Sequence, residues 1–329
     1  MPFPAGCSSL LKLLPWWCRP VSESMWRRTL EDELASLEPA LKQVLQAIAN
    51  AVADITIELR SAPVDKSGDT NQFGDQQLQA DVRTDEIIYR HLSESGCVET
   101  TSSEEMPEMR PAGGKGYSVA YDPLDGSSIF SANFSVGSIF GVWPGGEMVG
   151  QRGRDQSAAV YGLYGPKAVL VVARPASDTG EFIAQQFTLE NGVWCTSNDR
   201  IKIGEAKYIA PSNFRCTADN AEYRGLIMRC MEEGYSLRYS GGMVPDVHHI
   251  LSKGGGLFCC PSSKSFPAKL RLLFECAPMA LIVEACGGSS YGPKGCTLDQ
   301  VISTPNDRTS ISLGSKQEVK KSLLTLQNQ

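Results

Sequence analysis

The sequence predicts a layered α/β (α+β) protein, and three observations support this fold class. Apolar residues recur at steps of three and four through residues 34–59, which is the spacing of one buried helix face. Short apolar runs punctuated by Gly and Pro then indicate strands, and helical spacing returns near residues 219–233 and 278–286. Because helices and strands are mixed rather than regularly alternating, we expect stacked layers and not a simple doubly wound sheet.

The chain is expected to divide into an extension and two subdomains. Residues 1–30 form the expected extension: basic and apolar residues concentrate in the first 28 positions, but Pro15 and Pro20 interrupt them before a secretory signal is long enough. Residues 31–210 are expected to form an N-terminal α+β subdomain with long helices and a sheet. Residues 211–329 are expected to form a C-terminal α/β subdomain that completes the active site.

The individual elements follow from the same patterns. The first long helix is expected from residue 34 to residue 59, ending before Pro63, and the polar stretch as far as Gly74 indicates a mobile loop. A second helix is expected over residues 81–94. Apolar runs then predict four strands, at residues 117–121, 136–143, 158–163 and 168–173.

The composition excludes several classes of function. A net charge of −6 and an isoelectric point near 5.3 are the opposite of what a general nucleic-acid binder needs, so we expect no nucleic-acid partner. No apolar run approaches the length of a membrane span, so we expect no membrane partner. The 11 cysteines form no C-x-x-C pair and the three histidines have no zinc-ligand spacing. This favours free thiols and a cytoplasmic location, with the plastid as the alternative.

The sharpest local feature is the segment Asp122-Pro123-Leu124-Asp125-Gly126-Ser127-Ser128, which directly follows an apolar run. Asp-Pro and Asp-Gly pairs are each ordinary turn formers. Together, however, Pro123 restricts the backbone so that the two carboxylates and the Leu124 carbonyl can converge on a hard cation, which prefers oxygen ligands. The glycine and serines that follow offer N–H groups and hydroxyls, so the segment also predicts a phosphate site.

Acids elsewhere in the sequence could complete the same cluster, and they are Glu104, Glu105, Asp75, Asp81 and Glu275. The alternatives are a solvated acidic pair at residues 104–105 and a salt bridge from Glu275 to Lys269 or Arg271. Carboxylates without histidine suit Mg²⁺ or Mn²⁺. Clustered hard cations favour phosphoryl transfer to water.

The segment 122–128 resembles the signature of the magnesium-dependent, lithium-sensitive sugar and inositol phosphatases. Residues 135–141 and 269–275 narrow this resemblance to the fructose-1,6-bisphosphatase family. Within that family the chain is more similar to the sedoheptulose-1,7-bisphosphatase branch, in residues 73–78, 141–145, 153–156, 237–246 and 307–309. The resemblance extends from about residue 40 to residue 320 and implies the αβαβα sandwich of the sugar phosphatases.

The resemblance also implies how the residues act. Roughly two or three Mg²⁺ ions per subunit, with Mn²⁺ able to substitute, would be held by Glu104, Glu105, Asp122, the Leu124 carbonyl, Asp125 and Glu275. Asp81 and Glu105 match the acids that orient and deprotonate the attacking water, and Asp75 matches a loop acid that closes over the site. The implied substrate contacts are Asp125, Gly126, Ser127, Ser128, Asn213, Arg238, Tyr239, Met243, Lys269 and Arg271.

The implied reaction is hydrolysis of the 1-phosphate of sedoheptulose 1,7-bisphosphate, which gives sedoheptulose 7-phosphate and inorganic phosphate and belongs to pentose phosphate or Calvin-cycle metabolism. Fructose 1,6-bisphosphate as main or equal substrate is the nearest alternative. A non-catalytic sugar-phosphate sensor is an alternative of another class. In the family the arginine matched by Arg238 comes from a neighbouring subunit, so we expect a homodimer or homotetramer.

Three departures from the family pattern bear on specificity and regulation. Cys260 stands where fructose bisphosphatases carry a tyrosine, and the tyrosine expected shortly after Asn213 is absent from Phe214-Arg215-Cys216. These changes leave a roomier distal end with an added cation, which suits a seven-carbon sugar. The AMP-binding threonine and glycine are absent from the first helix and Gly116 replaces a lysine, so AMP inhibition is not expected. The redox cysteine pair of plastid enzymes is absent from residues 62–70, so thioredoxin control is not expected either.

Overall fold

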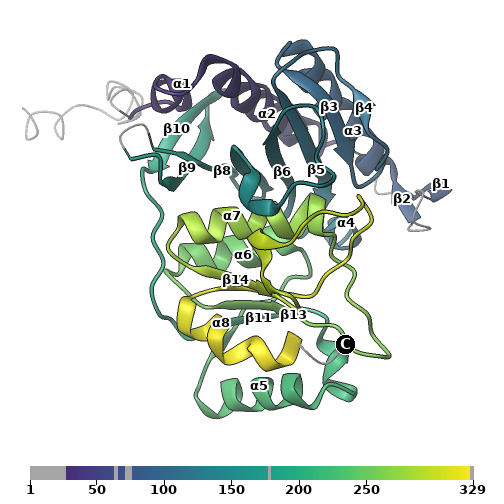
Figure 1. Ribbon diagram of the computed structural model, residues 1–329, viewed down its shortest axis with the longest axis vertical. Coiled ribbons are helices and arrows are strands. Elements are labelled where there is room, and N and C mark those ends of the chain that lie inside the picture. Colours follow the sequence, from purple (N-terminus) through teal and green to yellow (C-terminus); the bar gives the residue numbers. More distant parts are fainter. Residues whose placement is uncertain (1–26, 63–65, 71–75, 177–178, 327–329) are drawn as a thin grey trace, which may run out of the picture.

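The computed structural model describes residues 27–62, 66–70, 76–176 and 179–326, and these form five stacked layers (Figure 1). The layers are helices, an eight-stranded sheet, helices, a six-stranded sheet and helices. This is the αβαβα order expected from the sequence, so the predicted fold class is confirmed.

The first sheet has the strand order β10-β9-β8-β7-β6-β5-β3-β4, and all neighbours are antiparallel except the parallel pair β3 and β5. The four predicted strands lie within β5 to β8. The bounds of the strands are β3 (Val98–Ser103), β4 (Arg110–Pro111), β5 (Tyr117–Asp125), β6 (Val136–Pro144), β7 (Ala158–Tyr164), β8 (Ala168–Pro175), β9 (Phe182–Glu190) and β10 (Val193–Asn198).

The second sheet has the order β12-β11-β13-β16-β14-β15. Its strands are β11 (Tyr208–Pro211), β12 (Ser236–Leu237), β13 (Leu257–Cys260), β14 (Ser289–Gly292), β15 (Gly295–Cys296) and β16 (Ile311–Gly314). The predicted boundary between subdomains, at residues 210 and 211, falls inside β11 and stays a prediction.

A separate pair of strands, β1 (Lys66–Thr70) and β2 (Gln76–Leu78), lies where the sequence indicates a loop. The loop prediction is therefore wrong for residues 66–70. These polar residues lack the apolar alternation from which strands are predicted. Residues 63–65 and 71–75 lie outside the described part of the chain.

Three helical layers cover and separate the sheets (Figure 1). α2 (Pro39–Glu58) and α3 (Gln79–Glu94) cover the outer face of the first sheet, with the short α1 (Leu30–Leu34) beside them. α6 (Met243–Ser252) and α7 (Ala277–Ala285) lie between the sheets. α5 (Ala221–Glu232) and α8 (Lys316–Ser322) cover the outer face of the second sheet. The remaining single turns are α4 (Ser127–Phe130), η4 (Gly153–Asp155), η5 (Phe214–Ala218), the π-helical η6 (Leu272–Cys276), η7 (Thr297–Asp299) and η8 (Leu323–Leu326).

The first long helix begins later than the sequence predicts. α1 ends at Leu34 and α2 begins at Pro39, where the missing proline N–H is tolerated because the first N–H groups of a helix have no partner within it. The Glu38 carboxylate instead accepts hydrogen bonds from the Ala40 and Leu41 N–H groups, at 3.0 and 2.8 Å. The apolar period continues across this break, which is why periodicity alone does not locate it.

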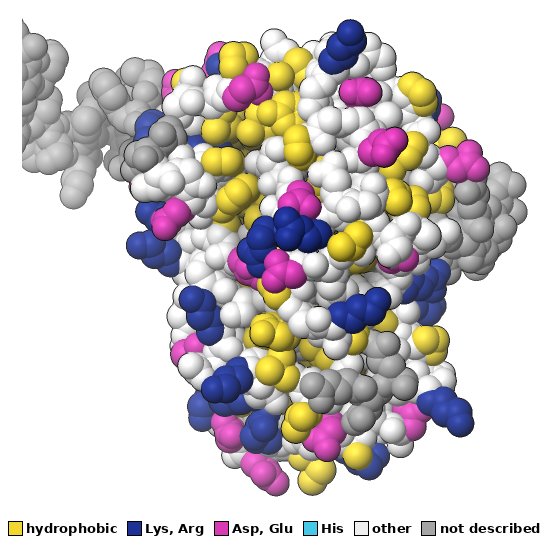
Figure 2. Space-filling view, viewed as in Figure 1, with side chains coloured by type: hydrophobic (Ala, Val, Ile, Leu, Met, Phe, Trp, Pro, Cys, Tyr) yellow, Lys and Arg dark blue, Asp and Glu magenta, His cyan; other side chains and the backbone are white. Residues whose placement is uncertain are grey.

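A continuous apolar core joins the two sheets through α7. Every residue of α7 from Ala277 to Val283 is buried, as expected for a helix that is apolar on all sides. The same core contains Ile139 of the first sheet and Phe258 of the second. On the face drawn in Figure 2, basic and acidic side chains are interspersed. Ion pairs such as Arg154 with Asp299 also link the halves, but they are exposed and contribute little beside this core.

Three smaller expectations concern the termini, the membrane and the cysteines. Thr29, within the predicted extension, pairs with Cys195 of β10, whereas residues 1–26 lie outside the described residues. No helix among the described residues is long and apolar enough to span a bilayer. The nine cysteines in the described part of the chain are free thiols, and most of them are buried.

Candidate active site

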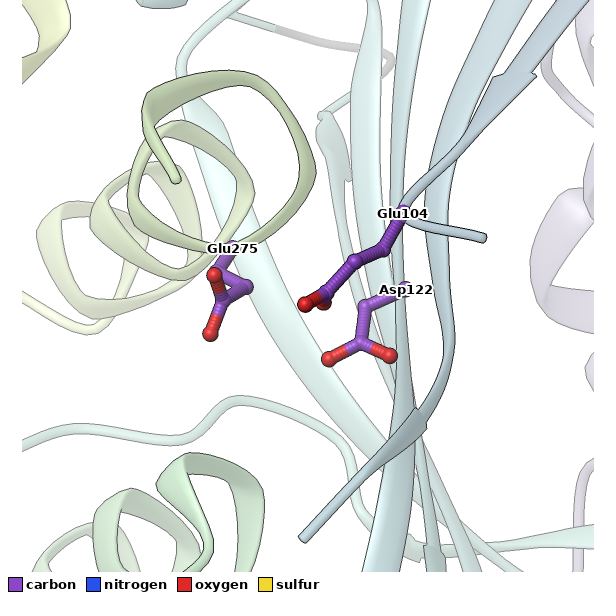
Figure 3. A group of neighbouring side chains, drawn as sticks. All are labelled: Glu104, Asp122 and Glu275. Carbon is purple, nitrogen blue, oxygen red and sulfur yellow. The ribbon is translucent and has the colours of Figure 1, made fainter. Parts of the chain in front are cut away.

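Three carboxylates meet between the first sheet and the helical layer inside the molecule (Figure 3). Ligand atoms of Glu104, Asp122 and Glu275 all lie within 4.8 Å of one another. Glu104 directly follows β3, Asp122 belongs to β5, and Glu275 belongs to η6. The cluster therefore joins residues from both halves of the chain, as the sequence predicts.

The alternation of strand β5 explains why Asp122 faces this cluster. Val119 and Tyr121 pack in the core beneath α2 and α3, whereas Ala120 packs in the core around α7. Because successive strand residues face opposite sides, Asp122 faces the α7 layer, from which Glu275 approaches. Its Oδ1 accepts a hydrogen bond of 3.0 Å from the Leu124 N–H, which fixes the carboxylate at the turn.

A short turn holds Glu104 and Glu105 beside β5. The Glu104 N–H donates to the Tyr121 carbonyl at 3.0 Å, and the Met106 N–H donates to the Ser103 hydroxyl at 2.9 Å. Glu104 also forms an ion pair with the Arg271 guanidinium. The alternative of a solvated acidic pair is therefore wrong for Glu104, whose side chain is only 19% exposed.

Glu275 is held by the backbone next to the same arginine. Its Oε2 accepts a hydrogen bond of 2.6 Å from the Arg271 N–H, across the first turn of η6. Both Glu275 and Arg271 are buried, whereas Lys269 is exposed. The arginine thus contacts two of the three clustered acids, one through its side chain and one through its main chain.

Asp125 has a different set of contacts from the other acids of its segment. Its carboxylate accepts hydrogen bonds from the N–H groups of Met243 and Val244, at 2.9 and 2.6 Å, and so connects β5 to the beginning of α6. It is not part of the three-carboxylate group. Burial raises the pKa of Asp125 to about 7, although these N–H groups oppose that rise.

The electrostatics of the cluster test whether a cation fits there. Burial, followed by the charge of Glu104, raises the pKa values of Asp122 and Glu275 well above those of ordinary carboxyl groups. These rises mean that the acids repel one another when ionised, despite the nearby Arg271. A hard divalent cation would remove that repulsion, and carboxylate oxygens are the ligands it prefers. The donor set therefore fits Mg²⁺ or Mn²⁺.

Asp81 lies next to the cluster, in the first turn of α3. Its carboxylate accepts a hydrogen bond of 2.8 Å from the Leu78 N–H. Burial raises the pKa of Asp81 to about 7, and the charges of Glu105 and Glu104 add to the rise. The structure thus brings together the two acids predicted to activate water, Asp81 and Glu105. Asp75, the predicted loop acid, lies outside the described residues.

The predicted phosphate site is a tight turn beside the cluster. Gly126 has φ of +86°, a left-handed conformation, and a Cβ there would lie 3.3 Å from the Gly242 Cα. Ser127 and Ser128 follow it at the start of α4. The position therefore favours glycine for two independent reasons.

Other predicted substrate contacts lie in the C-terminal half of the chain and differ in burial. The Asn213 amide donates both of its hydrogens to main-chain carbonyls, those of Pro261 and Phe266. Tyr239 is half exposed and Met243 is buried. Arg238 lies over the Tyr208 ring, with its guanidinium carbon 5.4 Å from the ring centroid.

Sequence reasoning missed two polar residues near the site. The Ser212 hydroxyl lies beside both the Tyr239 phenol and the Cys260 thiol, where it opposes the rise in their pKa values that burial causes, and no sequence signal marks it. Asp85 is buried one turn after Asp81 on α3, and the four-residue spacing from Asp81 could have indicated it.

The fold and the acid cluster define a class, the sugar bisphosphatases that hydrolyse phosphate monoesters. The chain belongs to the fructose-1,6-bisphosphatase family, because family models match residues 24–199 (Fructose-1-6-bisphosphatase, N-terminal domain) and residues 203–327 (Fructose-1-6-bisphosphatase, C-terminal domain). The predictions that the chain belongs to this family and that it is an enzyme are both confirmed.

Named relatives fall into two groups. The chain is 42% identical over 297 residues to the chloroplastic sedoheptulose-1,7-bisphosphatase of Triticum aestivum, covering 88% of this chain and 75% of that protein. It is 38% identical over 286 residues to the class 1 fructose-1,6-bisphosphatase of Citrifermentans bemidjiense, covering 85% of each. A crystal structure from Toxoplasma gondii, provisionally named a sedoheptulose-1,7-bisphosphatase, superposes with a TM-score of 0.84 at 34% identity over 91% of this chain and 98% of that one.

Proposed function

We propose that the protein hydrolyses the 1-phosphate of sedoheptulose 1,7-bisphosphate with Mg²⁺ as cofactor. The observation that carries this proposal is the buried group of Glu104, Asp122 and Glu275 beside Arg271. Bound Mg²⁺ would lower the pKa of a coordinated water and offset charge on the phosphoryl group. Glu105, the Leu124 carbonyl and Asp125 are proposed as further ligands.

The side chains of this chain would supply the remaining steps. Asp81 and Glu105 would take the proton from the attacking water, and a pKa of about 7 suits Asp81 to that task. The water oxygen bonds to phosphorus while the bond from phosphorus to the C1 oxygen breaks. The C1 oxygen takes up a proton from solvent and leaves as the sugar hydroxyl, and the proton taken by the acids is released to solvent. The N–H groups and hydroxyls of residues 126–128, with Arg271, would hold the phosphate.

The preference for the seven-carbon sugar rests on the distal end of the site. Cys260 is buried beside Ser212, which also lies beside Tyr239. A thiol at this position leaves space that a phenol would fill. Fructose 1,6-bisphosphate is the second candidate, because named relatives include enzymes of both kinds.

A homodimer or homotetramer is proposed from the position of Arg238. This residue lines a surface groove of about 490 Å³ together with Phe134, Leu237 and His249, none of which belongs to the acid cluster. Phe134 and Leu237 are more than half exposed, which favours burial against a second copy of the chain. Arg238 would then reach the distal phosphate of the neighbouring subunit.

Mixing two inactive variants tests this arrangement. Arg238→Ala and Asp122→Asn subunits, unfolded and refolded together, should regain about a quarter of wild-type activity per subunit, because half of the dimers carry one complete site. Light scattering should show a dimer or tetramer. A monomer, or no recovery on mixing, would contradict the proposal.

One assay decides among the candidate functions. Phosphate release is measured from sedoheptulose 1,7-bisphosphate and fructose 1,6-bisphosphate, with Mg²⁺ and with a chelator, and kcat/KM is compared. A higher value for the seven-carbon substrate and no release without metal are expected. Equal or reversed values would favour fructose 1,6-bisphosphate, and no release from either would favour a sensor.

A cytoplasmic location is proposed, with the plastid as the alternative given the chloroplastic relative. Microscopy of a fluorescent fusion distinguishes the two locations.

A further inference from the structure

Asp85 is a buried carboxylate that the proposed reaction does not use. It lies on α3, on the outer side of the first sheet, and is 5% exposed. The hydroxyl groups of Ser103 and Tyr121 lie beside it and favour its ionised form, which opposes the rise in its pKa that burial causes. Its Oδ1 nevertheless has no hydrogen-bond partner. A buried carboxylate with an unpaired oxygen opposes stability, so its position calls for another explanation.

The two hydroxyls come from the residues that precede two clustered acids. Ser103 ends β3 directly before Glu104, and Tyr121 lies in β5 directly before Asp122. Ser103 and Tyr121 are register partners in the parallel pair of β3 and β5. The Asp85 side chain therefore lies against both β3 and β5, at the position along the strands where Glu104 and Asp122 face the opposite side of the sheet.

The Ser103 hydroxyl extends this connection into the acidic turn. Its oxygen accepts the Met106 N–H at 2.9 Å, and the same hydroxyl lies beside Asp85, so it stands between α3 and the turn that carries Glu104 and Glu105. Tyr121 is buried against Phe140, with ring centroids 6.1 Å apart, which limits its hydroxyl to the same region. Movement of Asp85 would thus be passed to both ligand-bearing segments.

We propose that Asp85 is a positioning residue that sets the separation of the Glu104 and Asp122 carboxylates, and thereby the affinity of the site for a divalent cation. The inference rests on the proposed function, since it concerns the same metal site. Groups that support metal ligands in this way typically change metal affinity about 10- to 100-fold when they are removed.

The test measures Mn²⁺ binding to the metal-free protein by the electron paramagnetic resonance signal of free Mn²⁺. Asp85→Ala should weaken binding about 10- to 100-fold. Asp85→Asn keeps an oxygen that accepts both hydroxyls, so it should stay within about threefold of wild type. Ile88→Ala is the matched control: it removes a fully buried side chain from the same helix, and should lower stability without changing Mn²⁺ affinity.

The possible outcomes distinguish a failure of the positioning role of Asp85 from a failure of the proposed function. No Mn²⁺ binding by the wild type would overturn the proposed function. Normal binding by Asp85→Ala, equal weakening by Asp85→Asn, or equal weakening by Ile88→Ala would overturn the positioning role alone. If Asp85→Ala does not fold, Tyr121→Phe removes one hydroxyl only, and a severalfold loss of Mn²⁺ affinity is expected. Unchanged affinity in that variant would also overturn the inference.

Discussion

Glu275→Gln should raise the free energy of unfolding of the metal-free protein. The same substitution should remove most of the stability that Mg²⁺ adds. Glutamine keeps the oxygen that accepts the Arg271 N–H, so the local hydrogen bond can persist. What disappears is the negative charge that burial and Glu104 oppose, as the raised pKa of Glu275 indicates. Because the raised pKa means that ionisation opposes folding, the metal-free wild type should lose stability as pH rises above the ordinary glutamate value of 4.5, and the variant should lose less.

The size of the effect follows from the cluster geometry. The carboxylate oxygens lie within 4.8 Å of one another, and at that separation two unit charges interact by about 3.5 kcal/mol if the effective dielectric constant is about 20. The charges of Asp122 and Glu104 both repel the Glu275 carboxylate. The attraction of the Arg271 guanidinium cancels about one of these two repulsions. A gain of roughly 2–4 kcal/mol in the free energy of unfolding is therefore expected without metal.

Urea unfolding near neutral pH measures this gain, once with a chelator and once with excess Mg²⁺. Wild type should gain about 3 kcal/mol at a hundredfold excess of Mg²⁺ over its dissociation constant, and the variant far less. Turnover should fall by about two to four decades. Glu318→Gln is the control, because this buried carboxylate is paired with Lys321 at 2.8 Å and Tyr235 at 2.7 Å, so its loss should destabilise the protein equally with and without metal. A Glu275→Gln variant that is less stable without metal, or that keeps the wild-type Mg²⁺ response, would refute the reasoning.

The remaining predictions concern specificity, regulation and acid stability. Cys260→Tyr should lower kcat/KM for sedoheptulose 1,7-bisphosphate relative to fructose 1,6-bisphosphate by about 10- to 100-fold, and an unchanged ratio would place the discrimination elsewhere. AMP and reduced thioredoxin should leave activity unchanged in a phosphate-release assay, since the AMP-binding threonine and glycine and the redox cysteine pair of related enzymes are absent from this sequence; inhibition by AMP or reversible activation by thioredoxin would contradict this. Burial lowers the pKa of His248 to about 4, so the unfolded state binds the extra proton between pH 6.5 and 4 and stability falls as pH falls through that window. Between pH 7 and pH 5 the wild type should therefore lose about 2 kcal/mol more than His248→Gln in urea unfolding, and equal losses would show that His248 does not titrate in this way.

Local patterns predicted the parts of the fold that are set by local physics. Strands β5 to β8 and the buried α7 follow from apolar runs, and Asp122 was found because two acids flank a proline at the end of a strand. The break before α2 was missed because the apolar period of the two helices is continuous across it, although Pro39 marks its position. β1 was missed because a polar strand carries no periodic signal.

Contacts between distant residues account for most of what the sequence could not predict. Asp125 was predicted as a metal ligand from its neighbours, but its carboxylate is bonded to N–H groups at Met243 and Val244, which only the docking of α6 brings near. The engagement of both Asn213 amide hydrogens by carbonyls some 50 residues away is similarly invisible in the sequence. Asp85 acts through the pairing register of β3 and β5, which no local pattern encodes.

The wide spacing of the clustered acids along the chain has a consequence for the order of events during synthesis. Glu104 and Asp122 emerge from the ribosome long before Glu275, and Glu275 takes its place only once η6 and α7 dock between the two sheets. A chain that is incomplete at this point therefore carries Glu104 and Asp122 without the third acid, Glu275, or Arg271. Competence for hydrolysis is therefore acquired only after η6 and α7 have been made and have docked, so products truncated before η6 should be unable to hydrolyse sugar bisphosphates.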